Sequence, residues 1–216
     1  MERRVTFGAP MTPMVKRMLI VGGSIWLVSM IGIRHMQSES LAFLFSHTTL
    51  HPEWDSAHSV LSGEFWQPLT YLFLHDLFSV WHVAMNGLIL WFFGPLFEMR
   101  WGQRGFLQFF LLCGVGAGIL SIPPALIAPE LFGGPILGAS GAILGLIAAF
   151  GLLFPDRQIH LFFFLPVRGK HIIPITVGVD TLLFLTSPGS FAFATHLGGL
   201  ATGYLLITGK WRPSHW

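Results

Sequence analysis

Long apolar segments separated by shorter polar stretches dominate the hydropathy pattern of the chain. These apolar segments cover residues 17–34, 80–97, 105–128, 136–154, 171–187 and 190–209. A transmembrane helix needs about 20 mostly apolar residues, and each segment approaches that length. The apolar runs are continuous rather than alternating, which disfavours a β-barrel. The pattern therefore predicts an all-α polytopic membrane protein with a bundle of six transmembrane helices.

One membrane domain accounts for most of the chain. We place it at residues 17–209, between a cytoplasmic N-terminal tail at 1–16 and a cytoplasmic C-terminal tail at 210–216. The one long connection, residues 35–79, mixes histidine, serine and acidic residues with clusters of apolar ones. Such a mixture differs from the composition of a disordered linker. We therefore expect a long first loop that is partly embedded in the membrane.

Composition and charge support this interpretation. Of the 216 residues, 53% are hydrophobic and 10% are charged, whereas a soluble domain carries about 25% charged residues. With a cytoplasmic N-terminus, Arg34 is the only one of the 12 Lys and Arg residues that falls outside, as the positive-inside rule expects. The basic residues are then topology signals. We predict an integral protein of the bacterial inner (cell) membrane. Its surroundings are the lipid bilayer, and we expect no nucleic acid partner.

Polar side chains from different predicted helices fall at one depth below the outer surface. At about 1.5 Å per residue, Ser140 lies roughly 6 Å and His196 about 9 Å below the outer ends of their helices. His82 and Asn86 are four residues apart, so they share one helical face. The spacing therefore predicts that these four side chains occupy one outer layer of the bundle, in a site that opens to the outer side.

Glycines indicate which helices touch. Gly141 and Gly145 in one segment, and Gly199 and Gly203 in another, have the small-x-x-x-small spacing that lets helix backbones approach closely. Close approach of these two helices would bring their serine and histidine together. We therefore expect Ser140 to be a neighbour of a base.

Serine and histidine in contact form a nucleophile with its general base. A hydroxyl is a weak nucleophile until a base removes its proton, and His196 can act as that base and later as the acid. His82, Asn86 and the backbone N–H of Ser140 can stabilise an oxyanion. Asp180, a carboxylate within an apolar segment, could orient His196, but the sequence leaves its direction open.

Several segments together resemble the rhomboid family of intramembrane serine proteases. They follow one another in the family's order and spacing between residues 63 and 204: Gly63-Glu-Phe-Trp-Gln-Pro-Leu-Thr70, Phe73-Leu-His75, His82-Val-Ala-Met-Asn86, Glu98-Met-Arg-Trp-Gly102, Gly138-Ala-Ser-Gly141 and Ala194-Thr-His-Leu-Gly-Gly-Leu-Ala-Thr-Gly203. The resemblance implies a rhomboid-like six-helix bundle with a Ser140–His196 dyad. It also implies oxyanion donors at His82 and Asn86, and no cofactor, metal or catalytic aspartate.

The resemblance also implies a class of substrate, and the chain departs from the family pattern at two positions. Rhomboid substrates are single-span transmembrane proteins, cut within or beside their helix, with water reaching the dyad from the outer side. Gln67 stands where the family has an arginine after tryptophan, which leaves the role of that arginine in loop stability without a counterpart. Leu144 stands where an aromatic residue often packs on the catalytic histidine, so His196 is either held less firmly or held by another residue.

Other readings of the same residues stay open. A serine in a membrane helix usually bonds back to its own helix, and a non-catalytic rhomboid-like protein that binds membrane helices is the main alternative. A proton path through His196 and Asp180 would need polar residues continuing to the inner side, which the sequence does not show. His47 and His51 are spaced like a zinc pair, but no third ligand is evident from the sequence.

Overall fold

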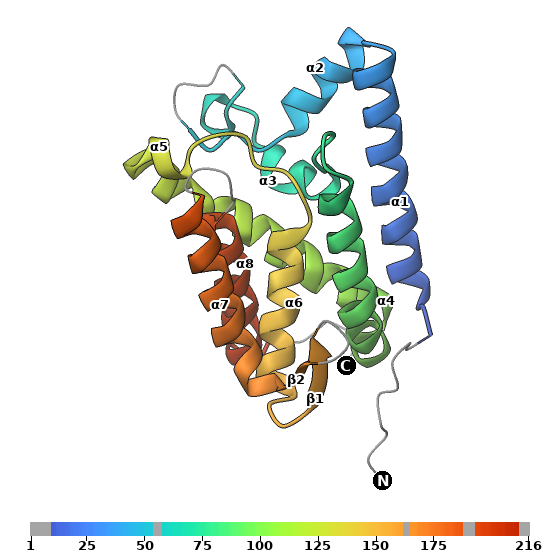
Figure 1. Ribbon diagram of the computed structural model, residues 1–216, viewed down its shortest axis with the longest axis vertical. Helices are drawn as coiled ribbons and strands as arrows, with labels where there is room; N and C mark the ends of the chain where they lie inside the picture. Colours follow the sequence, from blue (N-terminus) through green and yellow to red (C-terminus); the bar gives the residue numbers. More distant parts are fainter. Residues whose placement is uncertain (1–9, 54–57, 162–164, 188–192, 212–216) are drawn as a thin grey trace.

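Helices make up most of the protein. The computed structural model describes residues 10–53, 58–161, 165–187 and 193–211. Its helices are α1 (Pro13–Ser29), continued by a π-helix (Met30–His35), α2 (Glu39–Thr48), α3 (Gln67–Thr70), α4 (Val80–Ile127), α5 (Pro129–Phe132), α6 (Ser140–Leu153), α7 (Gly169–Thr186) and α8 (Phe193–Thr208), with 3₁₀ turns at Val60–Ser62 and Tyr71–Phe73. Figure 1 shows the long helices side by side, with α2 and α3 together at one end of the bundle.

One small hairpin departs from the predicted all-α fold. Strands β1 (Gln158–Leu161) and β2 (Leu165–Arg168) pair antiparallel, at the end of the molecule away from α2 and α3 (Figure 1). Ile159 and Val167 face each other across the hairpin and are both buried. Polar and apolar residues alternate along β1 with the period of a strand, whereas β2 begins with three apolar residues.

The predicted helices at 80–97 and 105–128 are the two arms of α4, which meet at a kink. Its backbone breaks at Gly102, where φ is 70° and ψ is 170°, a conformation that glycine adopts readily. Just before the break, the Glu98 carboxylate accepts hydrogen bonds at 2.9 Å from the backbone N–H groups of Met14 and Val15. A carboxylate at a helix N-terminus satisfies free N–H groups and favours the helix dipole. This contact explains why α1 begins at Pro13, ahead of the predicted residue 17.

The central helix of the bundle is α6. Every residue from Gly141 to Gly151 is buried, and α4, α7 and α8 pack around it. A Cβ atom added at Gly199 of α8 would lie 2.0 Å from the carbonyl oxygen of Gly141, and one at Gly203 would lie 2.5 Å from that of Gly145. The predicted close approach of these two helices through their glycines is therefore confirmed.

The chain ahead of α6 is not helical, although the predicted segment begins at residue 136. Ile136 instead exchanges two backbone hydrogen bonds, of 2.8 and 3.0 Å, with Leu50 of the long connection. Gly138 follows with a φ of +120°, which a non-glycine residue rarely adopts. Ser140 is consequently the first residue of α6 rather than a residue one turn inside the helix.

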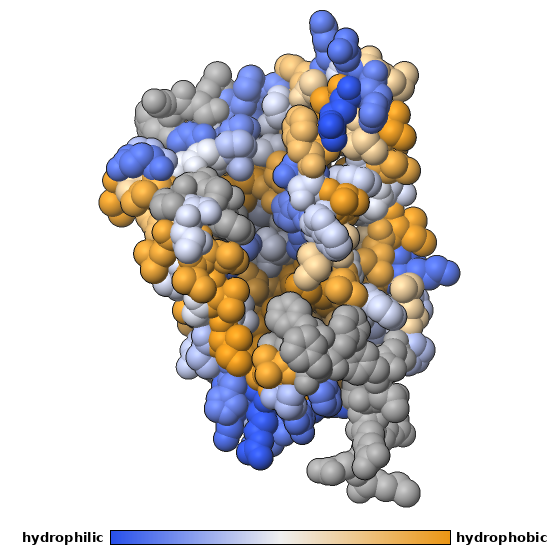
Figure 2. All heavy atoms as spheres, in the orientation of Figure 1, coloured by the Kyte–Doolittle hydropathy of each residue, from blue (hydrophilic) through white to orange (hydrophobic). Residues whose placement is uncertain are grey.

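Large apolar side chains cover much of the exterior. Ile20 of α1, Leu182 of α7 and Leu205 of α8 are all more than half exposed. Figure 2 shows hydrophobic residues along α7, with hydrophilic residues gathered towards the ends of the molecule. Among the described residues, the helical stretches Pro13–His35 and Val80–Ile127 are long and apolar enough to cross a membrane. Such an apolar exterior indicates contact with lipid or with another apolar surface.

Candidate active site

A serine and a histidine meet at the contact between α6 and α8. The Ser140 hydroxyl oxygen lies 2.9 Å from Nε2 of His196. Ser140 begins α6, and His196 lies in the first turn of α8. The glycine contacts between the two helices set this separation, because larger side chains would hold the backbones apart. The structure thus brings together the two residues that the sequence analysis paired as nucleophile and base.

Asp180 supports the histidine from the opposite side. Its two carboxylate oxygens lie 2.9 and 3.0 Å from Nδ1 of His196, and the aspartate is buried on α7. A carboxylate only accepts hydrogen bonds, so Nδ1 carries the proton and Nε2 is left as an acceptor for the Ser140 hydroxyl. This is the tautomer that a general base requires.

The aspartate contact answers two questions that the sequence left open. Asp180 points at His196, which the sequence could not establish because the facing of α7 depends on its packing. Leu144 is buried in the core of the bundle at the position where the resemblance suggests an aromatic support for the histidine. In this chain a hydrogen-bonded carboxylate fixes the imidazole instead.

His82 and Asn86 approach the backbone just ahead of the serine. A Cβ atom at Gly138 would lie 2.7 Å from Nε2 of His82 and 3.9 Å from Nδ2 of Asn86. Gly138 is therefore required twice, for its positive φ and for the space that these two side chains occupy. The two predicted oxyanion donors accordingly lie beside the segment that carries Ser140.

Hydrogen bonds assign the donor atoms of this pair. The backbone N–H of Asp76 donates to Nδ1 of His82 at 3.3 Å, which leaves the proton of the neutral ring on Nε2, the atom nearest Gly138. Nδ2 of Asn86 donates to the carbonyl oxygen of His82 at 2.9 Å, and an amide nitrogen has a second hydrogen to donate. Both side chains can therefore present an N–H group towards the serine.

Comparison with protein-family models identifies the family of this chain. The family model of the rhomboid domain matches residues 62–213. The chain belongs to the rhomboid family. Rhomboid proteins are embedded in membranes, which accounts for the exposed apolar side chains of the outer helices.

Individual relatives come from mitochondria and from a bacterium. The mitochondrial rhomboid protein 1 of Saccharomyces cerevisiae is 35% identical over 135 residues, which are 62% of this chain and 38% of the yeast protein. The human presenilin-associated rhomboid-like protein is 30% identical over 134 residues, 61% of this chain and 35% of its own length. The rhomboid protease GluP of Bacillus subtilis is 29% identical over 152 residues, 67% and 26% of the two chains. This rhomboid chain thus spans less than half of each of these relatives.

Gln67, where the rhomboid family pattern has arginine, is fully buried in the long connection. Its side-chain oxygen accepts the backbone N–H of His51 at 2.9 Å. Its nitrogen donates at 2.6 Å both to the carbonyl oxygen of His58 and to the carboxylate of Glu64. A neutral amide with three partners therefore organises the loop of this rhomboid protein.

Proposed function

We propose that this rhomboid protein is an intramembrane serine endopeptidase that cleaves the transmembrane segments of single-span membrane proteins through a Ser140–His196 dyad. The observation that carries the proposal is the 2.9 Å contact between the Ser140 hydroxyl and Nε2 of His196. That nitrogen is the unprotonated one, because the Asp180 carboxylate holds the proton on Nδ1. A hydroxyl hydrogen-bonded to an available base is the arrangement required for nucleophilic catalysis.

In the first half of the reaction, Ser140 Oγ attacks the carbonyl carbon of the scissile peptide bond while its proton moves to Nε2 of His196. The tetrahedral intermediate then collapses, the C–N bond breaks, and the same proton passes to the leaving amine. One product departs with a new amino terminus. The other remains as an ester on the serine oxygen.

In the second half, water replaces the departed amine. His196 takes one proton from the water, whose oxygen attacks the ester carbonyl, and returns the proton to Ser140 Oγ as the carboxylic product leaves. Asp180 stabilises the transient imidazolium through the hydrogen bond to Nδ1. It acts as a positioning residue, because it touches the histidine rather than the substrate.

The oxyanion of each tetrahedral intermediate needs fixed donors. We assign this role to the Nε2–H group of His82, the amide of Asn86 and the backbone N–H of Ser140. Support comes from their place beside Gly138, next to the nucleophile. Removal of one such donor typically lowers kcat by about 10²- to 10³-fold.

For the membrane arrangement, we propose six spans within a membrane domain at residues 17–209. A helix occupies most of each predicted apolar segment, although α6 is only 14 residues long. The charge distribution supports cytoplasmic termini, a site open to the outer side, and a first loop lying partly in the outer leaflet. The relatives include mitochondrial proteins as well as one bacterial protease. They therefore do not favour the predicted bacterial inner membrane over a mitochondrial membrane.

The test is proteolysis by the purified full chain in liposomes, with a single-span substrate whose transmembrane segment contains small residues. We expect Ser140→Ala to lose activity by more than about 10³-fold, as removal of a serine nucleophile does. The control is Ser121→Ala, which removes another buried hydroxyl that bonds only its own helix at Gly118. That variant should retain the wild-type rate.

A second measurement separates the protease from a non-catalytic protein that binds membrane helices. A fluorophosphonate should label wild-type protein at Ser140, and the label should disappear in His196→Ala. Unlabelled wild-type protein that still binds the substrate segment without cleaving it would favour the non-catalytic alternative.

A further inference from the structure

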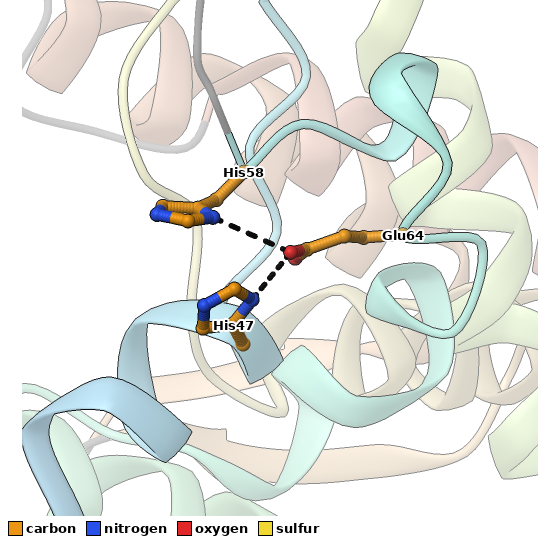
Figure 3. Close-up of side chains that lie close together, drawn as sticks. All are labelled: His47, His58 and Glu64. Atoms are coloured by element: carbon orange, nitrogen blue, oxygen red, sulfur yellow. Dashed lines mark hydrogen bonds and ion pairs between the residues drawn. The ribbon is translucent and has the colours of Figure 1, made fainter. Parts of the chain in front are cut away.

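A second cluster of chemically reactive side chains lies in the connection between α1 and α4. It consists of His47 at the end of α2, His58, and Glu64 just ahead of α3. One candidate ligand atom from each residue lies within 4.8 Å of the others. Figure 3 shows both imidazole rings directing a nitrogen at the carboxylate of Glu64. The proposed proteolysis uses none of these residues.

The separation between His58 and Glu64 fits two ligands around one small ion. Nδ1 of His58 lies 3.5 Å from Oε1 of Glu64, and Nδ1 of His47 contacts the same oxygen. Two ligands about 2.0–2.1 Å from zinc, at the tetrahedral angle, lie roughly 3.3–3.4 Å apart. The His58 side chain is 45% exposed, so its ring has room to rotate, and an ion would bind by replacing the hydrogen bond between His47 and Glu64.

The surroundings prepare the carboxylate for this role. Gln67 donates to Oε2 of Glu64 at 2.6 Å, which fixes the carboxylate with its other oxygen turned to the histidines. The Gln67 side-chain nitrogen also donates a hydrogen bond to the carbonyl oxygen of His58 at 2.6 Å. Hydrogen bonds that orient metal ligands from behind are a regular feature of metal sites.

We propose that His47, His58 and Glu64 bind one zinc ion, with water as the fourth ligand. Two imidazoles and one carboxylate favour zinc over magnesium or calcium, which prefer oxygen ligands. The sequence had paired His47 with His51 and found no third ligand. The fold gives His47 a different partner. His51 donates its backbone N–H to Gln67, whereas the ring of His58 packs against the ring of His47.

Bound zinc would join the end of α2 to two later points of the first loop, His58 and Glu64. The loop also hydrogen-bonds the chain ahead of α6 through Leu50 and Ile136, so the ion would reinforce a segment that leads to Ser140. This inference does not depend on proteolytic activity, and the binding experiment can use the Ser140→Ala protein.

The experiment is calorimetric titration of metal-free, detergent-solubilised full chain with zinc chloride, alongside thermal unfolding at each zinc concentration. We expect one zinc per chain and an unfolding temperature that rises until one equivalent is bound. His58→Ala should weaken binding at least tenfold, and His58→Cys, which supplies another zinc ligand, should restore it. His51→Gln is the matched control and should bind like the parent protein.

Three results would overturn the proposal. The first is no zinc binding by the parent protein, which would leave the cluster as a hydrogen-bonded latch. The second is stoichiometric zinc that His58→Ala leaves unchanged, which would place the ion elsewhere, for example at His196 and Asp180. The third is equally tight binding of magnesium chloride, which would contradict coordination by imidazole.

Discussion

At the scale of single residues, Asp180 determines which ring nitrogen of His196, the proposed base, carries the proton. It is buried on α7 and accepts the Nδ1–H of the histidine with both carboxylate oxygens. A buried carboxylate without a partner would be costly inside a membrane. The hydrogen bond therefore stabilises the aspartate and selects the histidine tautomer at the same time.

Removal of this charge should reduce turnover rather than substrate binding. We expect Asp180→Asn to lower kcat by at least tenfold and up to about 10⁴-fold, the loss seen for the matching change in soluble serine proteases. KM should stay within about threefold, because the aspartate does not contact substrate. Steady-state kinetics on a fluorogenic transmembrane substrate in liposomes would measure both parameters.

Two further variants identify the cause of that effect. Asp180→Glu keeps the charge and should recover part of the lost kcat, which a purely structural role would not require. Asp156→Asn removes an exposed carboxylate near the hairpin and should match wild type. Parallel changes in KM and in thermal stability for Asp180→Asn would argue against a positioning role.

The sequence predicted the Ser140–His196 pair but not the contact between Asp180 and His196. Ser140 and His196 could be paired because each lies near the outer end of a glycine-rich apolar segment, and depth along a helix follows from counting residues. Asp180 could be identified as an unusual buried carboxylate. Its direction could not, because a mostly apolar helix has no polar face from which its rotation can be inferred.

At the scale of elements, the α6–α8 contact sets the distance between Ser140 and His196, the proposed nucleophile and base. A Cβ atom at Gly199 would lie 2.0 Å from the carbonyl oxygen of Gly141, and neither backbone can yield without moving its helix. We expect Gly199→Ala to destabilise the protein by about 1–3 kcal/mol through overpacking. Activity should fall further than stability, because Ser140 and His196 separate.

Gly22→Ala is the matched control for this substitution. Gly22 lies inside α1, where an added Cβ would meet no atom within 4 Å apart from its own helix backbone and chain neighbours, and alanine favours a helix by about 0.5–1 kcal/mol over glycine. Thermal unfolding in detergent, paired with the liposome assay, would report both quantities. Unchanged activity in Gly199→Ala would show that the glycine contact does not control the site.

Helix positions followed from hydropathy more readily than helix ends. The apolar segments fall on α1, both arms of α4, α6, α7 and α8, because burial in lipid or protein favours long helices in such runs. The ends depend on distant partners that no local pattern reveals. Glu98 extends α1 from 84 residues away, and pairing between Ile136 and Leu50 delays α6.

At the scale of the whole molecule, a buried histidine in the loop before α4 ties stability to pH. His75 is only 5% exposed, and neither of its ring nitrogens has a hydrogen-bond partner among the described residues. Burial, with a smaller effect from the charge of neighbouring His82, lowers the pKa of His75 to about 4. The folded protein therefore keeps this ring neutral at pH values where the unfolded chain protonates it.

The direction of the effect follows from proton binding. Between pH 6.5, the ordinary pKa of the ring, and about 4, the unfolded state binds the proton and the folded state does not. Stability must therefore fall as pH decreases through this window. For one histidine the loss is on the order of 2–3 kcal/mol by pH 4. Carboxylates add their own titration only towards the acid end.

The substitution His75→Phe isolates this contribution, because phenylalanine fills a similar volume and cannot be protonated. We expect the variant to lose much less stability than wild type when the pH falls from 7 to 5, as measured by thermal unfolding in detergent. His160→Phe, at an exposed position on β1, should keep the wild-type pH dependence. If the slopes for wild type and His75→Phe coincide, the unfolding equilibrium is not linked to this ring, and another group that titrates near neutrality must account for the acid sensitivity.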